Sequence, residues 1–209
     1  MQYKKLLIAN RGEISLRIQN TAKKLGLNTV AVFSEVDAGA LHASNADESV
    51  FIGDSLPALS YLNIEKIIKA ALATGAEAIH PGYGFLSENA AFAEAVENEG
   101  LIWVGPPSKV IRSMGDKSAA KGIANSVNVP VLPTFETTSV SFEYPIMIKA
   151  LSGGGGRGMR LVSSEDEFQS LLIAAKKEAM NSFGDDRILL EKAVINPRHL
   201  EVQVLADNS

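Results

Sequence analysis

The sequence contains no cysteine, which excludes disulfide bonds and metal sites built from thiolates. It also lacks any apolar run near the roughly 20 residues that a membrane-crossing helix needs. Lysine and arginine together number 20 against 24 aspartates and glutamates, and they form no basic block. Because affinity for a nucleic-acid backbone needs clustered cations, neither a nucleic acid nor a membrane is an expected partner. The first five residues lead into a predicted strand instead of a signal peptide, which favours a cytoplasmic location.

The 209 residues are enough for one large or two modest domains, and 46% of them are hydrophobic. Between residues 4 and 105, short β-rich runs alternate with amphipathic stretches, a pattern typical of a parallel sheet. Strands are predicted at residues 6–9, 29–33, 49–52, 76–80 and 101–104. Three apolar helical faces are predicted between them, formed by Ile14, Ile18, Ala22 and Leu25, by Ile64, Ile67, Ile68, Ala71 and Leu72, and by Phe92, Ala93 and Val96. We therefore expect a doubly wound α/β domain.

The pattern changes after the Gly-Pro-Pro at residues 105–107, and we expect a domain boundary there. Two short helices are predicted at residues 108–113 and 117–127, followed by an irregular connection through residues 130–141. Further strands are predicted at residues 146–150, 159–162, 187–193 and 199–205. The helix predicted among them has a capping box at Ser164 and Glu167 and an apolar face of Phe168, Leu171, Leu172 and Ala175. These elements predict a small second domain.

A lysine on an apolar strand, Lys149, is followed closely by four consecutive glycines at residues 153–156. Glycine lets backbone N–H groups approach an anion that a Cβ would keep away, and the lysine supplies a point charge for the same anion. Arg157 and Arg160 add positive charge around this segment. The segment therefore predicts a polyphosphate site.

Other interpretations of this glycine-rich segment are possible. Gly153, Gly155 and Gly158 formally match a dinucleotide fingerprint. That fingerprint places a helix at the pyrophosphate, whereas a strand is predicted here at residues 159–162. A flap that covers phosphates, as in protein kinases, is the better analogy, and a merely flexible hairpin would leave the lysine unexplained.

Lys117 lies in Gly-Asp-Lys-Ser, which is not a Walker A loop because aspartate separates the glycine from the lysine. Since Lys117 opens a predicted helix, where the helix dipole gives a cation no benefit, a second phosphate contact would explain it. By spacing alone, a solvated surface lysine is the simpler interpretation.

Residues 80–89 follow a predicted strand and precede a helix, at the edge where α/β sheets bind ligands. Ser87 or Asn89 could equally cap the helix, and His80 could belong to the core. Residues 10–13 have the same ambiguity. On the last predicted strand, His199, Glu201 and Gln203 share a polar face that either borders a ligand or faces solvent. The sequence has no metal-ligand spacing of histidines and carboxylates and no nucleophile elbow, so a hydrolytic triad has no support.

Five segments together resemble the biotin carboxylase family, the ATP-grasp component of acetyl-CoA, propionyl-CoA and pyruvate carboxylases. They are IANRGEI at residues 8–14, HPGYGFLSEN at 80–89, MGDK at 114–117, GGGGRGM at 153–159 and PRHLEVQ at 197–203. The resemblance extends over the whole chain. It implies a Rossmann-like domain at residues 1–113 and a partial ATP-grasp domain at 114–209, with a glycine-rich lid at about 131–195. The start of a further sheet is implied at about residues 197–209.

The resemblance also implies roles for individual residues. Lys117 and Lys149 would contact ATP phosphates, and Gly155 and Gly156 would close over them. The hinge that receives adenine would consist of Glu191, Lys192, Ala193 and Val194. His199 would reach the ribose side, and Tyr83 would lie near the carboxylation site.

The implied reaction activates bicarbonate with ATP as carboxyphosphate and then carboxylates biotin on a carrier protein. A biotin carboxyl carrier protein, a carboxyltransferase and a second copy of the chain are the implied partners. The magnesium ligands and the residues that bind bicarbonate belong to a family segment beyond residue 209, so no metal ligand or catalytic residue is assigned here. We expect no carboxylase activity from these 209 residues alone.

Besides the family segment beyond residue 209, one further departure qualifies the resemblance. The connection between Pro130 and Tyr144 is shorter than the family's, which alters how the lid is attached. The acceptor, whether an acyl-CoA or a keto acid, is chosen by another subunit or domain. The alternatives are a different ATP-grasp ligase, against which residues 80–89 argue, and a non-catalytic module for nucleotide binding or assembly.

Overall fold

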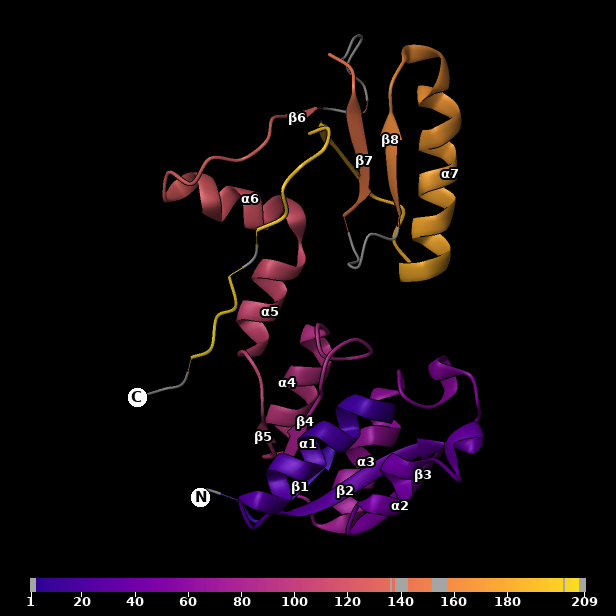
Figure 1. The fold of residues 1–209 in the computed structure, drawn as a ribbon, viewed down its shortest axis with the longest axis vertical. Helices are drawn as coiled ribbons and strands as arrows, with labels where there is room; N and C mark the ends of the chain where they lie inside the picture. Colours follow the sequence, from indigo (N-terminus) through magenta and orange to yellow (C-terminus); the bar gives the residue numbers. More distant parts are fainter. Residues whose placement is uncertain (1–2, 136, 138–142, 152–157, 201, 207–209) are drawn as a thin grey trace. The chain divides into compact units, whose positions relative to one another are not determined.

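The computed structural model describes residues 3–135, 137, 143–151, 158–200 and 202–206 (Figure 1). The chain divides into two compact units, Met1–Gly115 and Asp116–Ser209. No helix within the described ranges is both long enough and apolar enough to cross a membrane.

The first unit is built on a five-stranded parallel sheet, which confirms the predicted α/β fold. Its strands are β1 (Lys5–Ile8), β2 (Asn28–Ser34), β3 (Glu48–Gly53), β4 (Ala78–His80) and β5 (Ile102–Trp103), in the order β3-β2-β1-β4-β5. The direction of winding reverses between β1 and β4, so the loops that follow these two strands lie beside each other at one edge.

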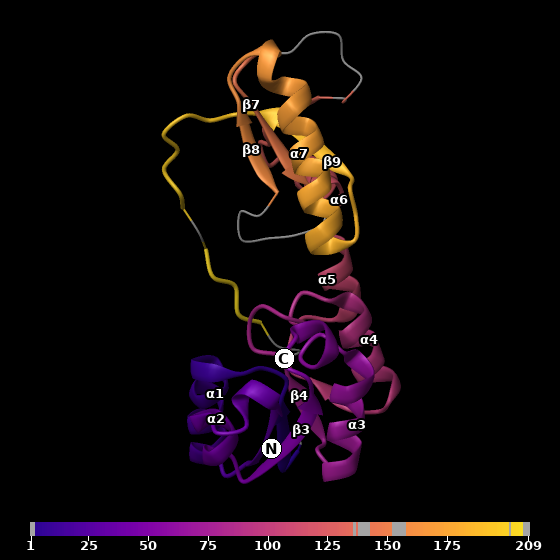
Figure 2. The ribbon, with the colours of Figure 1, turned by 90° about the vertical axis from the view of Figure 1, so that its right-hand side faces the viewer.

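Helices cover both faces of this sheet. They are α1 (Gly12–Lys24), α2 (Leu41–Asn45), α3 (Ile64–Thr74), α4 (Ala90–Asn98) and α5 (Ser108–Gly115), with short 3-10 helices η1 (Glu35–Asp37) and η2 (Pro57–Leu59). Figure 2 shows α1 and α2 on one side of the sheet and α3 and α4 on the other. On the α3 and α4 side the core includes Leu7, Val30, Ile67, Ile79 and Phe92, and on the α1 side Leu6, Ile8, Ile18 and Ala22. Each large apolar side chain buried here contributes about 1.5–3 kcal/mol.

Two leucines predicted on apolar helical faces are exposed. Leu25 has 53% of its surface exposed because α1 ends at Lys24 and Leu25 is the residue after it. Leu72 is 50% exposed and lines an open groove between α3 and α4. The other residues of those faces are buried or half-buried. The helical periodicity was therefore predicted correctly, and only the burial of these two leucines was wrong.

The second unit is an antiparallel sheet covered on one face by a long helix. Its strands are β6 (Thr134–Phe135), β7 (Ile146–Ala150), β8 (Met159–Val162) and β9 (Ile188–Lys192), in the order β6-β9-β7-β8. Its helices are α6 (Lys117–Ser126) and α7 (Glu165–Phe183). Figure 1 shows α7 beside β7 and β8. Its apolar core contains Ile146, Ile148, Val162, Phe168, Leu172, Ala175 and Leu190.

The start of α7 confirms the predicted capping box. The Glu167 carboxylate accepts the backbone N–H of Ser164 at 3.2 Å, and the Ser164 side chain completes the reciprocal pair. Two unpaired backbone donors at the helix start are satisfied in this way.

One prediction of an irregular connection and one of a strand were wrong in this unit. The connection predicted as irregular contains β6, a two-residue strand that pairs with β9. The strand predicted at residues 199–205 is not formed by its described residues, 199–200 and 202–205, which are exposed. A strand is stabilised by pairing with another backbone, and alternating apolar residues alone do not supply that partner.

Candidate nucleotide site

The candidate site lies on the face of the second sheet that α7 does not cover. Along β7 the side chains alternate, so Ile148 packs toward α7 while Met147 and Lys149 lie on the opposite face. Met147 is paired in register with Glu191 on β9. The sheet therefore places the Lys149 ammonium and the Glu191 carboxylate on one surface.

Glu191 is a buried carboxylate shared by two lysines. Only 3% of its surface is exposed, and its Oε1 pairs with the Lys149 ammonium while its Oε2 lies 2.6 Å from Nζ of Lys121. Burial alone would raise the pKa of Glu191, but the hydrogen bonds and charges of Lys121 and Lys149 outweigh it and lower that pKa. Glu191 is therefore ionised at neutral pH.

Helix α6 brings two lysines to this surface. Asp116 caps the helix by accepting the N–H groups of Ser118 and Ala119 at 2.8 and 2.9 Å. Residues four apart lie on one helical face, so Lys117 and Lys121 point the same way. Nζ of Lys117 donates to the carbonyl of Leu151 at 3.3 Å, next to the end of β7.

We call Lys117, Lys121, Lys149 and Glu191 the lysine cluster. Two ammonium groups, of Lys121 and Lys149, pair with the one carboxylate, and that of Lys117 lies at the carbonyl of Leu151 after β7, so the cluster has three cations and one anion, as a site for a polyanion requires. The structure brings together the two lysines named from the sequence, Lys117 and Lys149. Lys121 was missed, although its spacing of four residues from Lys117 on a predicted helix was a usable signal.

The residues after Glu191, predicted to form the adenine hinge, use part of their backbone in hydrogen bonds within the protein. The N–H of Lys192 donates to the carbonyl of Pro133, and the N–H of Ala193 donates to that of Pro145, both at 3.0 Å. Val194 is exposed. The N–H groups of Lys192 and Ala193 are therefore used in hydrogen bonds within the protein.

The segment that carries the glycines is anchored where it joins β8. The N–H of Ala150 donates to the carbonyl of Gly158, whose own N–H donates to Oε1 of Glu178 on α7, both at 3.1 Å. Gly158 has a φ of +68°, and a Cβ there would lie 2.9 Å from Cβ of Ala150, so only glycine fits. Gly155 and Gly156, named from the sequence as phosphate contacts, lie outside the described residues.

His199 is exposed in an irregular segment and not on a strand. The polar strand face on which it was predicted is therefore not formed by the described residues, and Glu201 lies outside them. Within the described ranges, no three histidine, cysteine or acidic side chains gather as metal ligands would.

In the first unit, the loop after β4 is joined to the end of β1 by Asn10. The Asn10 amide donates to the carbonyls of Pro81 and Tyr83 at 2.7 and 2.8 Å. Gly82 has a φ of +66°, and a Cβ there would lie 2.8 Å from the Asn10 amide nitrogen. Nδ1 of His80 accepts the Gly82 N–H at 3.0 Å, and burial lowers the pKa of His80. For Asn10 and His80, these contacts favour the structural interpretation over ligand binding.

Two other residues of the segment 80–89 differ in their surroundings: Asn89 has a structural hydrogen bond and Tyr83 is exposed. Asn89 caps α4 by accepting the N–H of Phe92 at 3.0 Å, as one of the two sequence interpretations proposed. Tyr83 is exposed, and its hydroxyl donates to Glu13, which raises the pKa of Tyr83. Tyr83 belongs to the first unit and the lysine cluster to the second.

A second buried carboxylate, Asp37, lies near the carboxyl end of β2, and no sequence pattern predicted it. It is 5% exposed and accepts bonds from Arg11 at 2.7 Å, Ser34 at 3.0 Å and Tyr61 at 2.6 Å. Burial, together with the bond to Asp37, raises the pKa of Tyr61 to about 12. The network joins β1, β2 and the segment before α3, and all of its donors come from the protein itself.

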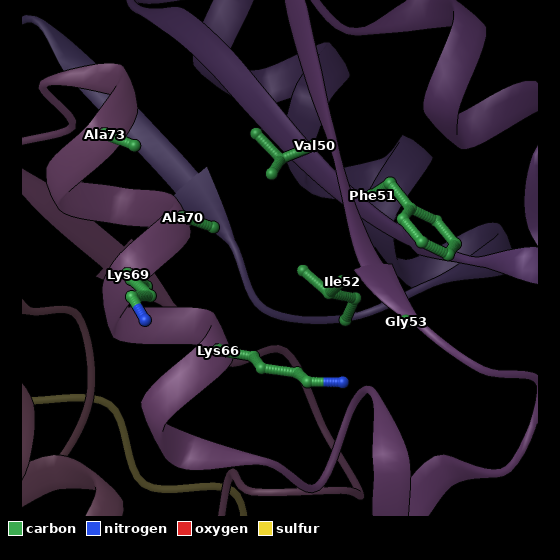
Figure 3. Close-up of a pocket in the computed structure, with 8 residues that line it drawn as sticks. All are labelled: Val50, Phe51, Ile52, Gly53, Lys66, Lys69, Ala70 and Ala73. Atoms are coloured by element: carbon green, nitrogen blue, oxygen red, sulfur yellow. The ribbon is translucent and has the colours of Figure 1, made fainter.

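A pocket of about 390 Å³ opens between β3 and α3 of the first unit (Figure 3). It is lined by Val50, Phe51, Ile52, Gly53, Lys66, Lys69, Ala70 and Ala73. Figure 3 shows Lys66 extending toward the Gly53 end of β3, where its Nζ donates to the carbonyl of Leu59 at 2.7 Å. The lining has no acid, base or nucleophile other than the two lysines, so the pocket has no set of groups for catalysis.

Comparison with known proteins identifies both units. Residues 2–111 match the family model of the biotin carboxylase N-terminal domain, and residues 116–209 match that of the carbamoyl-phosphate synthase L chain, ATP binding domain. The chain is 50% identical to the propionyl-CoA carboxylase alpha chain of Ruegeria pomeroyi, over 99% of this chain and 32% of the relative. It is 51% identical to the biotin carboxylase of Nostoc, over 100% of this chain and 49% of the relative.

Solved structures agree with these matches. A Campylobacter jejuni biotin carboxylase complex with β-γ-ATP aligns with a TM-score of 0.87 and 42% identity, over 94% of this chain and 46% of that one. Rhizobium etli pyruvate carboxylase aligns with a TM-score of 0.87 and 44% identity, over 91% and 18%. This chain thus spans about a third to a half of the length of the curated relatives named above. It belongs to the biotin carboxylase family, whose members are ATP-dependent ligases.

Proposed function

We propose that the second unit binds ATP at the lysine cluster, for the activation of bicarbonate in a biotin-dependent carboxylase. The observation that carries this proposal is the convergence of Lys117 and Lys149, from a helix and a strand, at the end of β7, just before the glycines in the sequence. The ATP-binding family model over residues 116–209 and the solved relative with a bound ATP analogue support it.

In this proposal the chain's own residues act by position and charge. Lys117 and Lys149 offset the negative charge of the phosphates, which is the main contribution that a protein makes to phosphoryl transfer. ATP supplies the phosphoryl group that activates bicarbonate as carboxyphosphate, from which biotin is carboxylated. Residues 114–209 would then form part of an ATP-grasp domain, with residues 131–195 as its lid.

Further site residues belong to the same proposal. Gly155 and Gly156 would cover the phosphates, Glu191–Val194 would line the adenine, and His199 would reach the ribose. Tyr83 would lie near the carboxylation site. The partners would be a biotin carboxyl carrier protein, a carboxyltransferase and a second copy of the chain, since one related carboxylase domain is described as a dimer.

Calorimetric titration of the chain with ATP tests the proposal. The variants Lys149→Ala and Lys117→Ala each remove a charged contact to phosphate, so ATP affinity is expected to fall at least about tenfold. The matched control is Lys176→Ala, an exposed lysine on α7, which is expected to leave the affinity unchanged.

If the unmodified chain binds no ATP, or if the three alanine variants weaken binding equally, the proposed site is wrong. Co-purification with carboxylase subunits provides a second readout. An association that does not depend on nucleotide, in a chain that binds none, would favour an assembly module.

A further inference from the structure

The Glu191 side chain is the one acidic group within the lysine cluster. Each of its two oxygens faces a different lysine, Lys149 on β7 and Lys121 on α6. The two lysines retain 25% and 21% exposure of their side chains, whereas the Glu191 side chain retains 4%. The carboxylate is therefore fixed in the interior, and the two cations extend from it to the surface.

This arrangement matters because a buried carboxylate needs a cation. A carboxylate that loses all of its partners in a poorly solvated place is strongly destabilised. If Glu191 had only Lys149, any movement of Lys149 to a phosphate would leave the carboxylate without a partner. With Lys121 on the other oxygen, Glu191 stays paired while Lys149 moves.

Lys121 is itself held by a second contact. Its Nζ donates to the carbonyl of Leu132 at 3.1 Å as well as to Glu191 at 2.6 Å, so it joins α6 to the connection before β6. For Lys149, by contrast, which lies on β7, the ion pair with Glu191 is the contact that the described residues show, and its side chain is 25% exposed. Of the two cations, Lys149 is the one placed to turn toward a phosphate.

We propose that Glu191 positions the Lys149 ammonium for the nucleotide phosphates, and that Lys121 is the counter-ion that keeps Glu191 paired when Lys149 turns to them. This inference rests on the proposed function and gives the Glu191 side chain a role separate from the backbone contacts of the hinge. Lys121 acts through Glu191 and does not touch the nucleotide. Both are positioning residues.

Calorimetry with ATP and with adenosine separates positioning from a general loss of structure. Glu191→Gln keeps the size of the side chain and removes its charge, so the two ammonium groups repel each other and Lys149 loses its fixed position. ATP affinity is expected to fall about tenfold while adenosine affinity changes less than about twofold, because adenosine has no phosphate. Equal losses for both ligands would indicate a purely structural role and overturn the proposal.

The reactivity of Lys149 gives a readout that needs no nucleotide. Acetylation of surface amines, followed by mass spectrometry, measures how strongly each lysine is held. In Glu191→Gln, Lys149 is expected to react several-fold faster than in the unmodified chain, since an amine freed from an ion pair is more available as a nucleophile. An unchanged rate would contradict the positioning role.

Two further variants test Lys121. Lys121→Met removes the counter-ion and is expected to weaken ATP about threefold to tenfold, whereas Lys121→Arg keeps the charge and is expected to restore most of the affinity. Glu143→Gln is the matched control for Glu191, because Glu143 is an exposed carboxylate paired with Lys192 at 2.6 Å.

These outcomes separate this inference from the proposed function. A chain that binds no ATP would refute the proposed function. ATP binding that depends on Lys149 but is unchanged or tighter in Glu191→Gln would refute only the positioning role. A Lys121→Met variant with unchanged affinity would refute the counter-ion role.

Discussion

Each of the two units contains a buried carboxylate, and the two differ in how they are satisfied. Asp37 in the first unit accepts bonds from the guanidinium of Arg11 and from two hydroxyls, those of Ser34 and Tyr61. Glu191 in the second unit is paired with two lysines whose ammonium groups reach the surface. Two of the three donors to Asp37 are hydroxyls of the buried residues Ser34 and Tyr61, as expected of a carboxylate that stabilises the fold. Both partners of Glu191 are lysines with partly exposed side chains, and one of them, Lys149, is the cation proposed to turn to a ligand.

The difference also matches the surroundings of the two groups. The Asp37 network includes Tyr61, which is buried and stacks on Phe85 with ring centroids 5.1 Å apart. The Glu191 cluster lies on the sheet face opposite the apolar core of its unit. Removing Asp37 should therefore mainly affect the stability of the first unit, whereas removing Glu191 should mainly affect ligand binding by the second.

The largest effect is expected from Asp37→Ala. It leaves the hydroxyls of Ser34 and Tyr61 without their acceptor in a buried place and frees Arg11, so the first unit is expected to lose about 3 kcal/mol of stability. Urea unfolding measures this loss. ATP affinity of the folded variant should stay unchanged, and a selective loss of ATP binding would break the comparison.

A smaller loss of stability is expected from Glu191→Gln. Lys121 and Lys149 can turn to water once the charge is gone, and glutamine still offers one acceptor, so the second unit should lose about 1–2 kcal/mol. The same urea unfolding, followed by a probe within residues 116–209, checks the value. A loss as large as that of Asp37→Ala would show that Glu191 is as structural as Asp37.

Most of the fold could be predicted from the sequence, because the spacing of the apolar residues reflects which side chains are buried. The parallel sheet, the capping box at Ser164 and the apolar face of α7 all follow from local patterns that the structure confirms. The strand at residues 199–205 was predicted by the same reasoning and was wrong in its described part, since alternation cannot identify a pairing partner.

The candidate site was only partly predictable for a similar reason. Lys117 and Lys149 lie within short recognisable motifs, so they were named from the sequence. The roles proposed for Lys121 and for the Glu191 side chain depend on contacts between α6, β7 and β9. These elements are far apart in the chain, so local sequence patterns do not reveal the contacts. Asp37 is the same case, because its partners Arg11 and Tyr61 lie 26 and 24 residues away.

Acid should weaken the two units over different pH ranges. His42 in the first unit is 1% exposed, and burial lowers its pKa despite the opposing charge of Asp37. Below about pH 6.5 the unfolded chain then binds the proton first, so stability falls as pH falls, by at most about 1.4 kcal/mol per pH unit for one histidine. His80 has the same sign, because burial also lowers its pKa.

In the second unit the lowered pKa of Glu191 acts in a lower range. Its contribution is fully present above about pH 4.3, the ordinary value for glutamate, and is lost as pH falls toward the lowered value. Unfolding measured between pH 7 and 3 should therefore show the first unit weakening earlier. His42→Leu should reduce the slope between pH 6.5 and 5, and an unchanged slope would exclude His42 as its source.

The smallest effects are expected from the two helix caps, and they test whether the units are independent. Asn89 caps α4 in the first unit, and Asp116 caps α6 in the second by accepting two N–H groups. Replacement of either residue by alanine is expected to cost about 1 kcal/mol. Asn89→Ala should shift only the unfolding of residues 1–115, and Asp116→Ala only that of residues 116–209.

Because Asp116 also sets the start of the helix that carries Lys117 and Lys121, its loss should weaken ATP binding as well, whereas loss of Asn89 should not. If both variants shifted one common transition by the same amount, the two units would fold as a single body, and the contrast between their carboxylates could no longer be read from unfolding experiments.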